Sequence, residues 1–383
     1  MRLGWPRLPW DAGHLVVWPS VVLALCAAMI MPGVAQAGYT FTGGGTSTGT
    51  ATGDSSTETL YLRATSGLIY HSTDGATFSS DWGSGLTIAA SGSNTINVAV
   101  STGNGSGIVL GDATSPASAL QATIAVVVST VNGGDTTLID DSANASAMTY
   151  VVDTEPGFIT AAGISYNQSL SNAFTGGVTL KGSSAGCTYN IKSVLHPAVS
   201  TAEPFTAIAG GGDDSFLIPG PLLTTLGSAT NLQGGAGVNS LDFTGVTDPI
   251  VGTLSGGSFA GVTNLTDSGI QNVVGGDNSD TFTVIPGAQA QSVDGGLPTP
   301  PTSPGDSLTV NISGTTDPAL TVTQTPDGLQ GQYTFGNAAP VSFQHIETLS
   351  PLLGQSIPVL PTSGLAALAV LLALTGMWLA RRR

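Results

Sequence analysis

Hydrophobic and polar residues alternate along most of this chain with the two-residue period of a β-strand. Between the two ends, no segment shows the 3.6-residue periodicity of an amphipathic helix. The alternating segments are short, rich in Val, Ile and Thr, and bounded by residues that favour turns. They include Thr95–Val100, Ala122–Val131, Thr136–Asp140, Met148–Val152, Val178–Leu180, Tyr189–Val194, Ser307–Ile312 and Leu320–Gln324. The sequence therefore predicts an all-β body.

A glycine turn followed by an acid or amide and then a strand recurs along the body. Its copies are Asn132–Leu138, Ala209–Leu217, Gly234–Asp242, Gly275–Thr283 and a split copy, Asp294–Gly296 with Gly305–Val310. Repeated strand-turn units are typical of a solenoid. We therefore expect a Gly/Asp-rich β-solenoid, with tandem β-sandwich modules as the alternative.

The residues that follow the turns predict the core. We expect the strands Phe216–Ile218, Ser240–Phe243 and Thr281–Ile285 to begin just after their turns. Phe216, Leu241, Phe282 and Leu308 should then be buried at equivalent places in a shared core.

These turns resemble the Gly-Gly-x-Gly-x-Asp repeat of calcium-binding β-rolls in hemolysin-type secreted proteins, and the degenerate repeats of large bacterial surface proteins. The resemblance covers roughly residues 130 to 350 and implies calcium as a ligand, with these candidates: Asp213, Asp214, Asp277 and Asp280. The presumed equivalents Asp214, Asn239, Asp280 and Asp306 lie 25, 41 and 26 residues apart. We expect this spacing to separate the turns, so that the acids act as turn formers, no cofactor is needed and calcium binding stays the alternative.

Arg2 and Arg7 precede an apolar run from Leu15 to Met31, and Ala35-Gln36-Ala37 fits the small-x-small pattern of a secretory cleavage site. Residues 1–37 are therefore predicted to be a signal peptide, with the mature chain starting at Gly38. Residues 38–56, which are mostly Gly, Thr and Ser, predict a flexible lead-in to a β-repeat body over residues 57–350.

The other end carries a second apolar run. A linker over residues 351–363 contains Ile357, Pro358, Val359 and Leu360, and residues 364–380 are apolar up to Arg381, Arg382 and Arg383. Seventeen residues at about 1.5 Å each reach the lower limit for a membrane-spanning helix. The basic cluster favours a cytoplasmic end. Residues 364–383 thus predict a transmembrane helix with a basic tail.

This tripartite tail resembles the IPTL-CTERM type of bacterial sorting signal, with Val359 where the family has Thr. The resemblance implies export machinery and a C-terminal processing enzyme as partners. An ordinary tail anchor is the alternative. The expected localisation is export, anchoring in the inner membrane before processing, and then the cell surface or the extracellular space.

Charge narrows the choice of partners. Between Gly38 and Ala380 the basic residues are Arg63, Lys181 and Lys192, against 23 acids, which gives a net charge of −20. Such a surface repels nucleic acid and anionic lipid, so we expect no nucleic-acid partner and membrane contact only through the C-terminal helix. Cys187 is the one cysteine after the predicted signal peptide, which excludes an intramolecular disulfide and a cysteine-based metal site.

Two enzyme motifs occur in the body. Gly182–Gly186 matches a nucleophile elbow with Ser184 at its centre, and Gly305-Asp306-Ser307-Leu308 spells a lipase/esterase signature. Both require an α/β domain, whereas here each is followed by a predicted strand. A β-helix enzyme that degrades polysaccharide with paired carboxylates is the remaining catalytic alternative.

The sequence therefore predicts a non-enzymatic protein that is secreted or displayed on the surface. Its expected role is structural or adhesin-like, in the bacterial envelope or extracellular matrix. Extracellular polysaccharide or other surface proteins are its expected partners, and a calcium-binding β-roll-like protein is the non-catalytic alternative.

Overall fold

The computed structural model describes residues 39–43, 48–53, 59–83, 87–91, 94–100, 106–128, 136–153, 159–168, 176–192, 204–220, 229–297 and 305–353. This part of the chain is all-β, and its one helical element is the short 3-10 helix η1 (Ala117–Leu120). No helix within it is long and apolar enough to cross a membrane. The predicted signal peptide, the sorting motif and the transmembrane helix lie outside the described residues.

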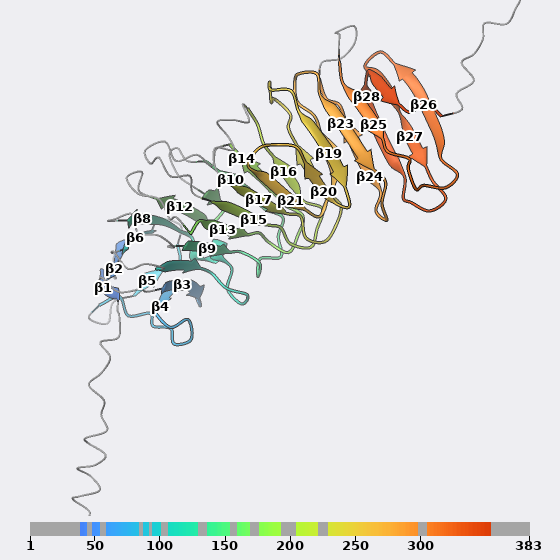
Figure 1. Ribbon diagram of the computed structural model, residues 1–383. Coiled ribbons are helices and arrows are strands. Elements are labelled where there is room, and N and C mark those ends of the chain that lie inside the picture. The colour runs from blue at the N-terminus through green and yellow to red at the C-terminus, as the bar shows by residue number, and fades with distance from the viewer. Residues whose placement is uncertain are drawn as a thin grey trace, which may run out of the picture.

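The strands stack into an elongated body, in which they follow one another along the long axis from one chain end to the other (Figure 1). Three sheets make up this stack. The arrangement, with long parallel sheets, is solenoid-like.

The longest sheet has 15 strands, in the order β1 (Tyr39–Gly43), β2 (Thr48–Gly53), β6 (Asn94–Val100), β8 (Ala122–Val128), β12 (Ile164–Gln168), β11 (Ile159–Ala161), β10 (Thr149–Val152), β14 (Thr188–Ile191), β16 (Ser215–Leu217), β18 (Asn239–Asp242), β22 (Ile270–Val274), β24 (Gln291–Asp294), β28 (Val341–Ile346), β27 (Gly328–Thr334) and β26 (Ala319–Thr325). The second has nine, in the order β21 (Leu265–Ser268), β17 (Thr230–Gln233), β15 (Phe205–Ile208), β13 (Val178–Lys181), β9 (Thr136–Asp140), β7 (Gly107–Leu110), β3 (Thr59–Thr65), β4 (Leu68–Ser72) and β5 (Ile88–Ala89). The third has five, in the order β20 (Ser258–Ala260), β19 (Val251–Ser255), β23 (Thr281–Ile285), β25 (Ser307–Val310) and β29 (Thr348–Ser350).

The chain winds by alternating between sheets. From β13 to β18 it contributes one strand to the nine-stranded sheet and the next to the 15-stranded sheet, and each strand pairs in parallel with its equivalent one winding later. From β22 to β25 successive strands alternate between the long sheet and the five-stranded sheet instead. The hairpin β26–β27 then adds to the long sheet before β28 and β29 resume the alternation. We call one such winding a rung.

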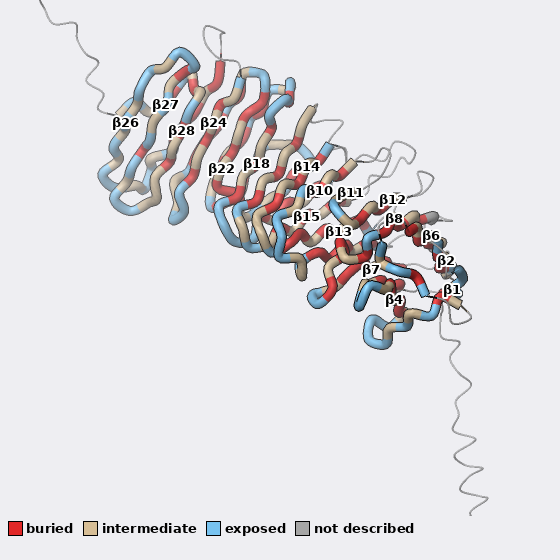
Figure 2. Tube along the Cα trace, turned by 180° about the vertical axis from the view of Figure 1, so that it is seen from behind, coloured by how far each residue is buried: buried red, intermediate tan, exposed pale blue. Residues whose placement is uncertain are grey.

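The core lies between the sheets, where strand residues alternate between buried and partly exposed positions (Figure 2). One inward column of the long sheet runs in register through Tyr150, Tyr189, Phe216, Leu241, Val273, Val293 and Phe343. All seven side chains are buried. The rings of Tyr189 and Phe216 stack with their centroids 4.8 Å apart, so aromatic side chains of neighbouring rungs pack on each other.

The predicted strands agree with the observed ones to within a few residues. Thr136–Asp140 and Thr281–Ile285 coincide with β9 and β23, and Ser307–Ile312 overlaps β25. The burial predicted for Phe216, Leu241, Phe282 and Leu308 is confirmed, since each is at most 1% exposed.

Their equivalence needs a correction. Phe216 and Leu241 pair in the 15-stranded sheet, whereas Phe282 and Leu308 pair in the five-stranded sheet. The four residues therefore form two columns in two sheets.

The Gly/Thr/Ser-rich lead-in expected over residues 38–56 departs from the prediction. Residues 39–43 and 48–53 form the antiparallel pair β1 and β2, and β2 then pairs in parallel with β6. The alternation of inward and outward residues explains why strands form here, because Tyr39 and Ala51 are buried while threonines occupy most outward positions. Antiparallel hairpins close both ends of the long sheet, since β26 and β27 pair in the same way.

Candidate functional site: stacked carboxylates and a polar hollow

Acid and amide side chains connect the turns of neighbouring rungs next to the long sheet. Asp214 Oδ1 accepts a hydrogen bond from the Cys187 amide at 2.7 Å, and Asn239 Oδ1 accepts one from the Asp214 amide at 2.9 Å. Gln271 Oε1 continues the series by accepting from the Asn239 amide at 2.7 Å. Each rung thus uses one side chain to bind the backbone of the rung before it. We call this series the first ladder.

A second ladder stands beside the five-stranded sheet. The amides of Ile250 and Gly276 donate to Asp280 Oδ1 and Oδ2, each at 2.7 Å. Asp306 Oδ1 accepts from the Asp280 amide at 2.7 Å, and Glu347 Oε2 accepts from the Asp306 amide at 2.5 Å. Because these bonds satisfy buried backbone donors, the ladder holds consecutive rungs in register.

The ladders correct the expectation that the spacing of 25, 41 and 26 residues keeps the turns apart. A rung here takes about 25 residues, so Asp214 and Asn239 are neighbours in space, as are Asp280 and Asp306. The 41-residue step is the place where the repeat moves from one sheet to the other. Sequence reasoning missed Gln271 and Glu347 because neither follows a glycine pair directly, and the hydrogen bonds alone identify them.

Burial changes the acidity of these groups. It raises the pKa of Asp214 and of Asp280 to about 6. Burial, reinforced by the neighbouring carboxylates of Asp280 and Glu347, raises the pKa of Asp306 to about 8. Asp214 Oδ2 and Asp306 Oδ2 are buried without a hydrogen-bond partner. A protonated carboxyl is therefore the form that these sites favour at mildly acidic pH.

The four calcium candidates lie in two separate turns. Asp213 is exposed and accepts from the Val238 amide at 2.8 Å, and Asp277 is exposed. Asp214 and Asp280 are buried and bind backbone amides. Among the described residues, no group of three or more His, Cys, Asp or Glu side chains could hold a metal ion. Asp213, Asp214 and Asp280 each give Oδ1 to a backbone amide of a neighbouring rung, and calcium needs six to eight oxygen ligands, so the two turns do not form a calcium cage.

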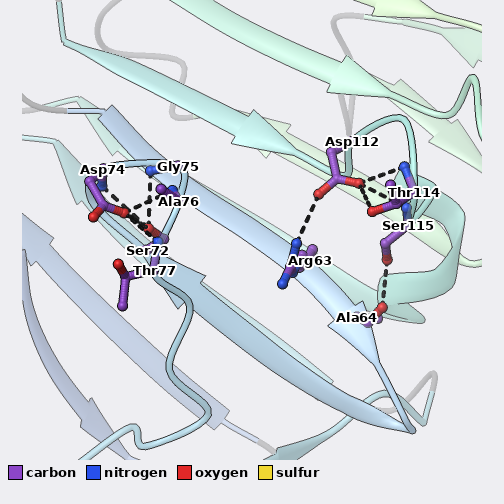
Figure 3. A network of polar contacts seen from close by, with 10 residues as sticks. All are labelled: Arg63, Ala64, Ser72, Asp74, Gly75, Ala76, Thr77, Asp112, Thr114 and Ser115. Atoms are coloured by element: carbon purple, nitrogen blue, oxygen red, sulfur yellow. Dashed lines mark hydrogen bonds and ion pairs between the residues drawn. The ribbon is translucent and has the colours of Figure 1, made fainter.

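Elsewhere aspartates shape surface turns, as Figure 3 shows for two of them. Asp74 Oδ1 accepts from the amides of Ala76 and Thr77 at 2.8 and 2.7 Å, and these bonds lower its pKa. Asp112 binds the amide and hydroxyl of Thr114 in the same way and lies 3.4 Å from Arg63. These are turn-forming roles of the kind expected from the sequence.

The two enzyme motifs lie in the strand-turn units. Ser184 is in the turn between β13 and β14, where its Oγ donates to the Asn144 carbonyl at 3.0 Å. Ser307 opens β25 and contacts the Asp280 carbonyl and Thr281 Oγ1. A strand follows each motif, so neither has the strand-turn-helix geometry of a nucleophile elbow.

The outer face of the long sheet is hollowed near its C-terminal end. A hollow of about 310 Å³ lies over β22, β24 and β28, and its polar lining consists of Gln271, Asn272, Gln289, Gln291, Ser292 and Ser342. A second hollow of about 210 Å³ shares Ser292 and Ser342 with it and adds Asp294 and Gln344. The two hollows therefore adjoin.

Gln291 is the unusual member of this lining. It is 3% exposed, and neither its Nε2 nor its Oε1 has a hydrogen-bond partner. A buried polar atom left without a partner costs about 1–3 kcal/mol. Beside it, Asp294 is fully engaged, because Oδ1 lies 2.6 Å from His345 Nδ1 and Oδ2 accepts from Gln344 Nε2 at 2.6 Å.

The fold defines the class of this protein as all-β and solenoid-like. No family model, no curated protein and no solved structure matches this chain. The fold, the two ladders and the polar hollow are therefore the features from which a function can be proposed.

Proposed function

We propose that this chain is a non-enzymatic, exported protein of the bacterial envelope or extracellular matrix, with a structural or adhesin-like role. The observation that carries the proposal is the uninterrupted 15-stranded sheet, which spans the described residues from β1 to β26. A stack of rungs gives length and a repeated outer face without a catalytic centre. Such a body suits display at a distance from a membrane.

Charge and chemistry support the same role. Lys181 pairs with Asp140 at 3.1 Å and Arg63 with Asp112 at 3.4 Å, so two of the three basic residues of the body are engaged in ion pairs. The remaining surface is acidic and repels anionic polymers. The buried acids bind backbone amides, which is a structural use of carboxylates.

The export and membrane anchoring of the protein are part of this proposal. Residues 1–37 would direct export, and residues 364–383 would hold the protein in the inner membrane until a processing enzyme acts at the motif Ile357–Leu360. The body would then reach the cell surface or the medium.

The proposal is tested by protease treatment of intact cells of the native host. We expect the body to be cleaved without lysis, and a chain that ends at Ser356 to leave the envelope for the medium or the periplasm. Ser363→Ala, which changes the linker outside the motif, should behave like the unaltered chain. A body that is digested only after lysis, in the cytoplasmic fraction, would contradict the proposal.

A further inference from the structure

A column of hydroxyl and amide side chains runs along the outer face of the long sheet. Consecutive parallel strands place in register Thr188, Ser215, Ser240, Asn272, Ser292 and Ser342. All six are partly exposed. Strands lie about 4.8 Å apart, so the column offers a small neutral polar group at each step along the long axis.

The column enters the 310 Å³ hollow at Asn272, Ser292 and Ser342. Several hydrogen-bonding groups in the hollow remain for a ligand. Asn272 Oδ1 accepts from Ser292 Oγ at 2.6 Å, which leaves Nδ2 of Asn272 to donate. Gln289 Oε1 accepts from Gln271 Nε2 at 3.2 Å, which leaves Nε2 of Gln289. Gln291 also lines the hollow, but its Nε2 and Oε1 are buried and lie out of a ligand's reach.

The chemistry of these groups selects a ligand that both donates and accepts hydrogen bonds and carries no charge. The lining contains no Lys or Arg, and its carboxylate, Asp294, is already paired with His345 and Gln344. An anion would find no cation there and would meet an acidic body. A ligand hydroxyl can donate a hydrogen bond to an amide or serine oxygen and can accept one from an amide or serine donor. The elongated column suits a polymer that carries hydroxyl groups along its length.

We propose that the hollow and the column bind a neutral polysaccharide, with Asn272, Gln289 and Ser342 as contact residues. This inference rests on the proposed display function and names the ligand class of a displayed body. Because the described lining offers hydrogen bonds and no exposed aromatic platform, each saccharide unit would bind weakly, and affinity would grow with chain length.

The test uses the full-length protein in detergent and soluble saccharide probes: dextran, mannan and xyloglucan as neutral chains, and alginate as the acidic chain. Isothermal titration calorimetry measures Kd for each. We expect at least one neutral chain to bind and alginate not to bind. Asn272→Ala and Ser342→Ala should each weaken binding about three- to tenfold, the range expected for one neutral hydrogen bond. Ser215→Ala, in the same column but outside the hollow, is the matched control and should weaken binding less.

Gln291→Leu is a second control. The substitution removes a buried amide that has no partners and that a ligand cannot reach, so the melting temperature should stay or rise while binding is unchanged. Unchanged binding in both Asn272→Ala and Ser342→Ala, tighter binding of alginate, or no binding of any neutral chain would overturn the inference. These readouts use purified protein, so they are independent of localisation. A protein displayed on cells that binds none of the neutral chains would overturn this inference alone, and a binder confined to the cytoplasm would overturn the display function alone.

Discussion

The glycines of the turns serve two different physical needs. Gly235 and Gly296 have φ of +70° and +85°, a left-handed conformation that glycine adopts without strain. Gly212 is different, because a Cβ built there would lie 2.0 Å from the amide nitrogen of Gly186 in the neighbouring rung. The glycine turns in the sequence indicated the need for a left-handed backbone conformation. The close approach of two rungs arises only when the rungs stack, so it could not be predicted from one repeat.

We predict that Gly212→Ala lowers the free energy of unfolding by about 2–3 kcal/mol, because the added methyl group must push two backbones apart. Gly287→Ala is the control, since no atom lies within 4 Å of the position that its methyl group would take and its φ is not left-handed. Chemical denaturation compares the two. Equal effects would show that rungs do not approach closely at Gly212.

The buried acids predict an unusual dependence of stability on pH. Their pKa values in the folded chain, about 6 for Asp214 and Asp280 and about 8 for Asp306, lie above the ordinary aspartate value of 3.8. The folded chain therefore binds more protons than the unfolded chain in this window, and stability falls as pH rises. The contribution is fully present below about pH 4 and is lost as pH rises through about 8. We expect a melting temperature several degrees higher at pH 5 than at pH 9, at constant ionic strength.

Asp306→Asn should flatten this dependence between pH 6 and 9. The amide oxygen can still accept from the Asp280 amide, while the unpartnered Oδ2 is replaced by a neutral group. At pH 9 we expect a gain of about 1–3 kcal/mol in the free energy of unfolding. Asp327→Asn makes the same chemical change at an exposed turn and should leave the slope unaltered. Identical slopes in both variants would contradict the assignment of the pH dependence to Asp306.

At the scale of elements, the strands were the most predictable part. The period of two and the β-branched residues placed β9, β13 and β23 closely, because each strand has one buried face. The sheet to which a strand belongs was not predictable. Phe216 and Phe282 follow similar glycine turns, yet their strands join different sheets, since pairing partners lie a whole rung away.

The candidate site was less predictable than the strands. Asp214, Asp280 and Asp306 were recognisable from their turns. Gln271, in β22, and Glu347, between β28 and β29, complete the ladders from positions without the repeat signature. The polar hollow had no local signal, because Asn272, Ser292 and Ser342 come from three strands that are 20 and 50 residues apart in the chain. Outward polar residues of this kind look like ordinary surface in a single sequence.

For the strands themselves, we predict that Phe282→Asp destabilises far more than Asp280→Asn. Truncating a buried Phe costs about 3–5 kcal/mol, and a carboxylate left in the core adds to this loss. Asp280→Asn removes one acceptor from a side chain that binds two amides, at about 1–3 kcal/mol. Denaturant unfolding of both variants decides the order. The reverse order would contradict the placement of Phe282 in the core.

At the scale of the whole molecule, the chain between Gly38 and Ala380 combines a net charge of −20 with closely stacked rungs. Salt screens exposed charges over about 8–10 Å, so any salt should relieve part of the repulsion. Because the ladder oxygens bind backbone amides, we predict that calcium and sodium raise the melting temperature alike at matched ionic strength. A calcium-specific rise of several degrees that Asp280→Ala abolishes would instead establish a metal site.

The display of this body outside the cytoplasm is the central claim, and the two ends of the native protein test it most directly. The protein is recovered from the envelope and the medium of its host, and mass spectrometry identifies both termini. We predict a first residue near Gly38 and, in the released form, a last residue that precedes the apolar run beginning at Gly364. Recovery of a single form that starts at Met1 and stays in the cytoplasm would contradict it.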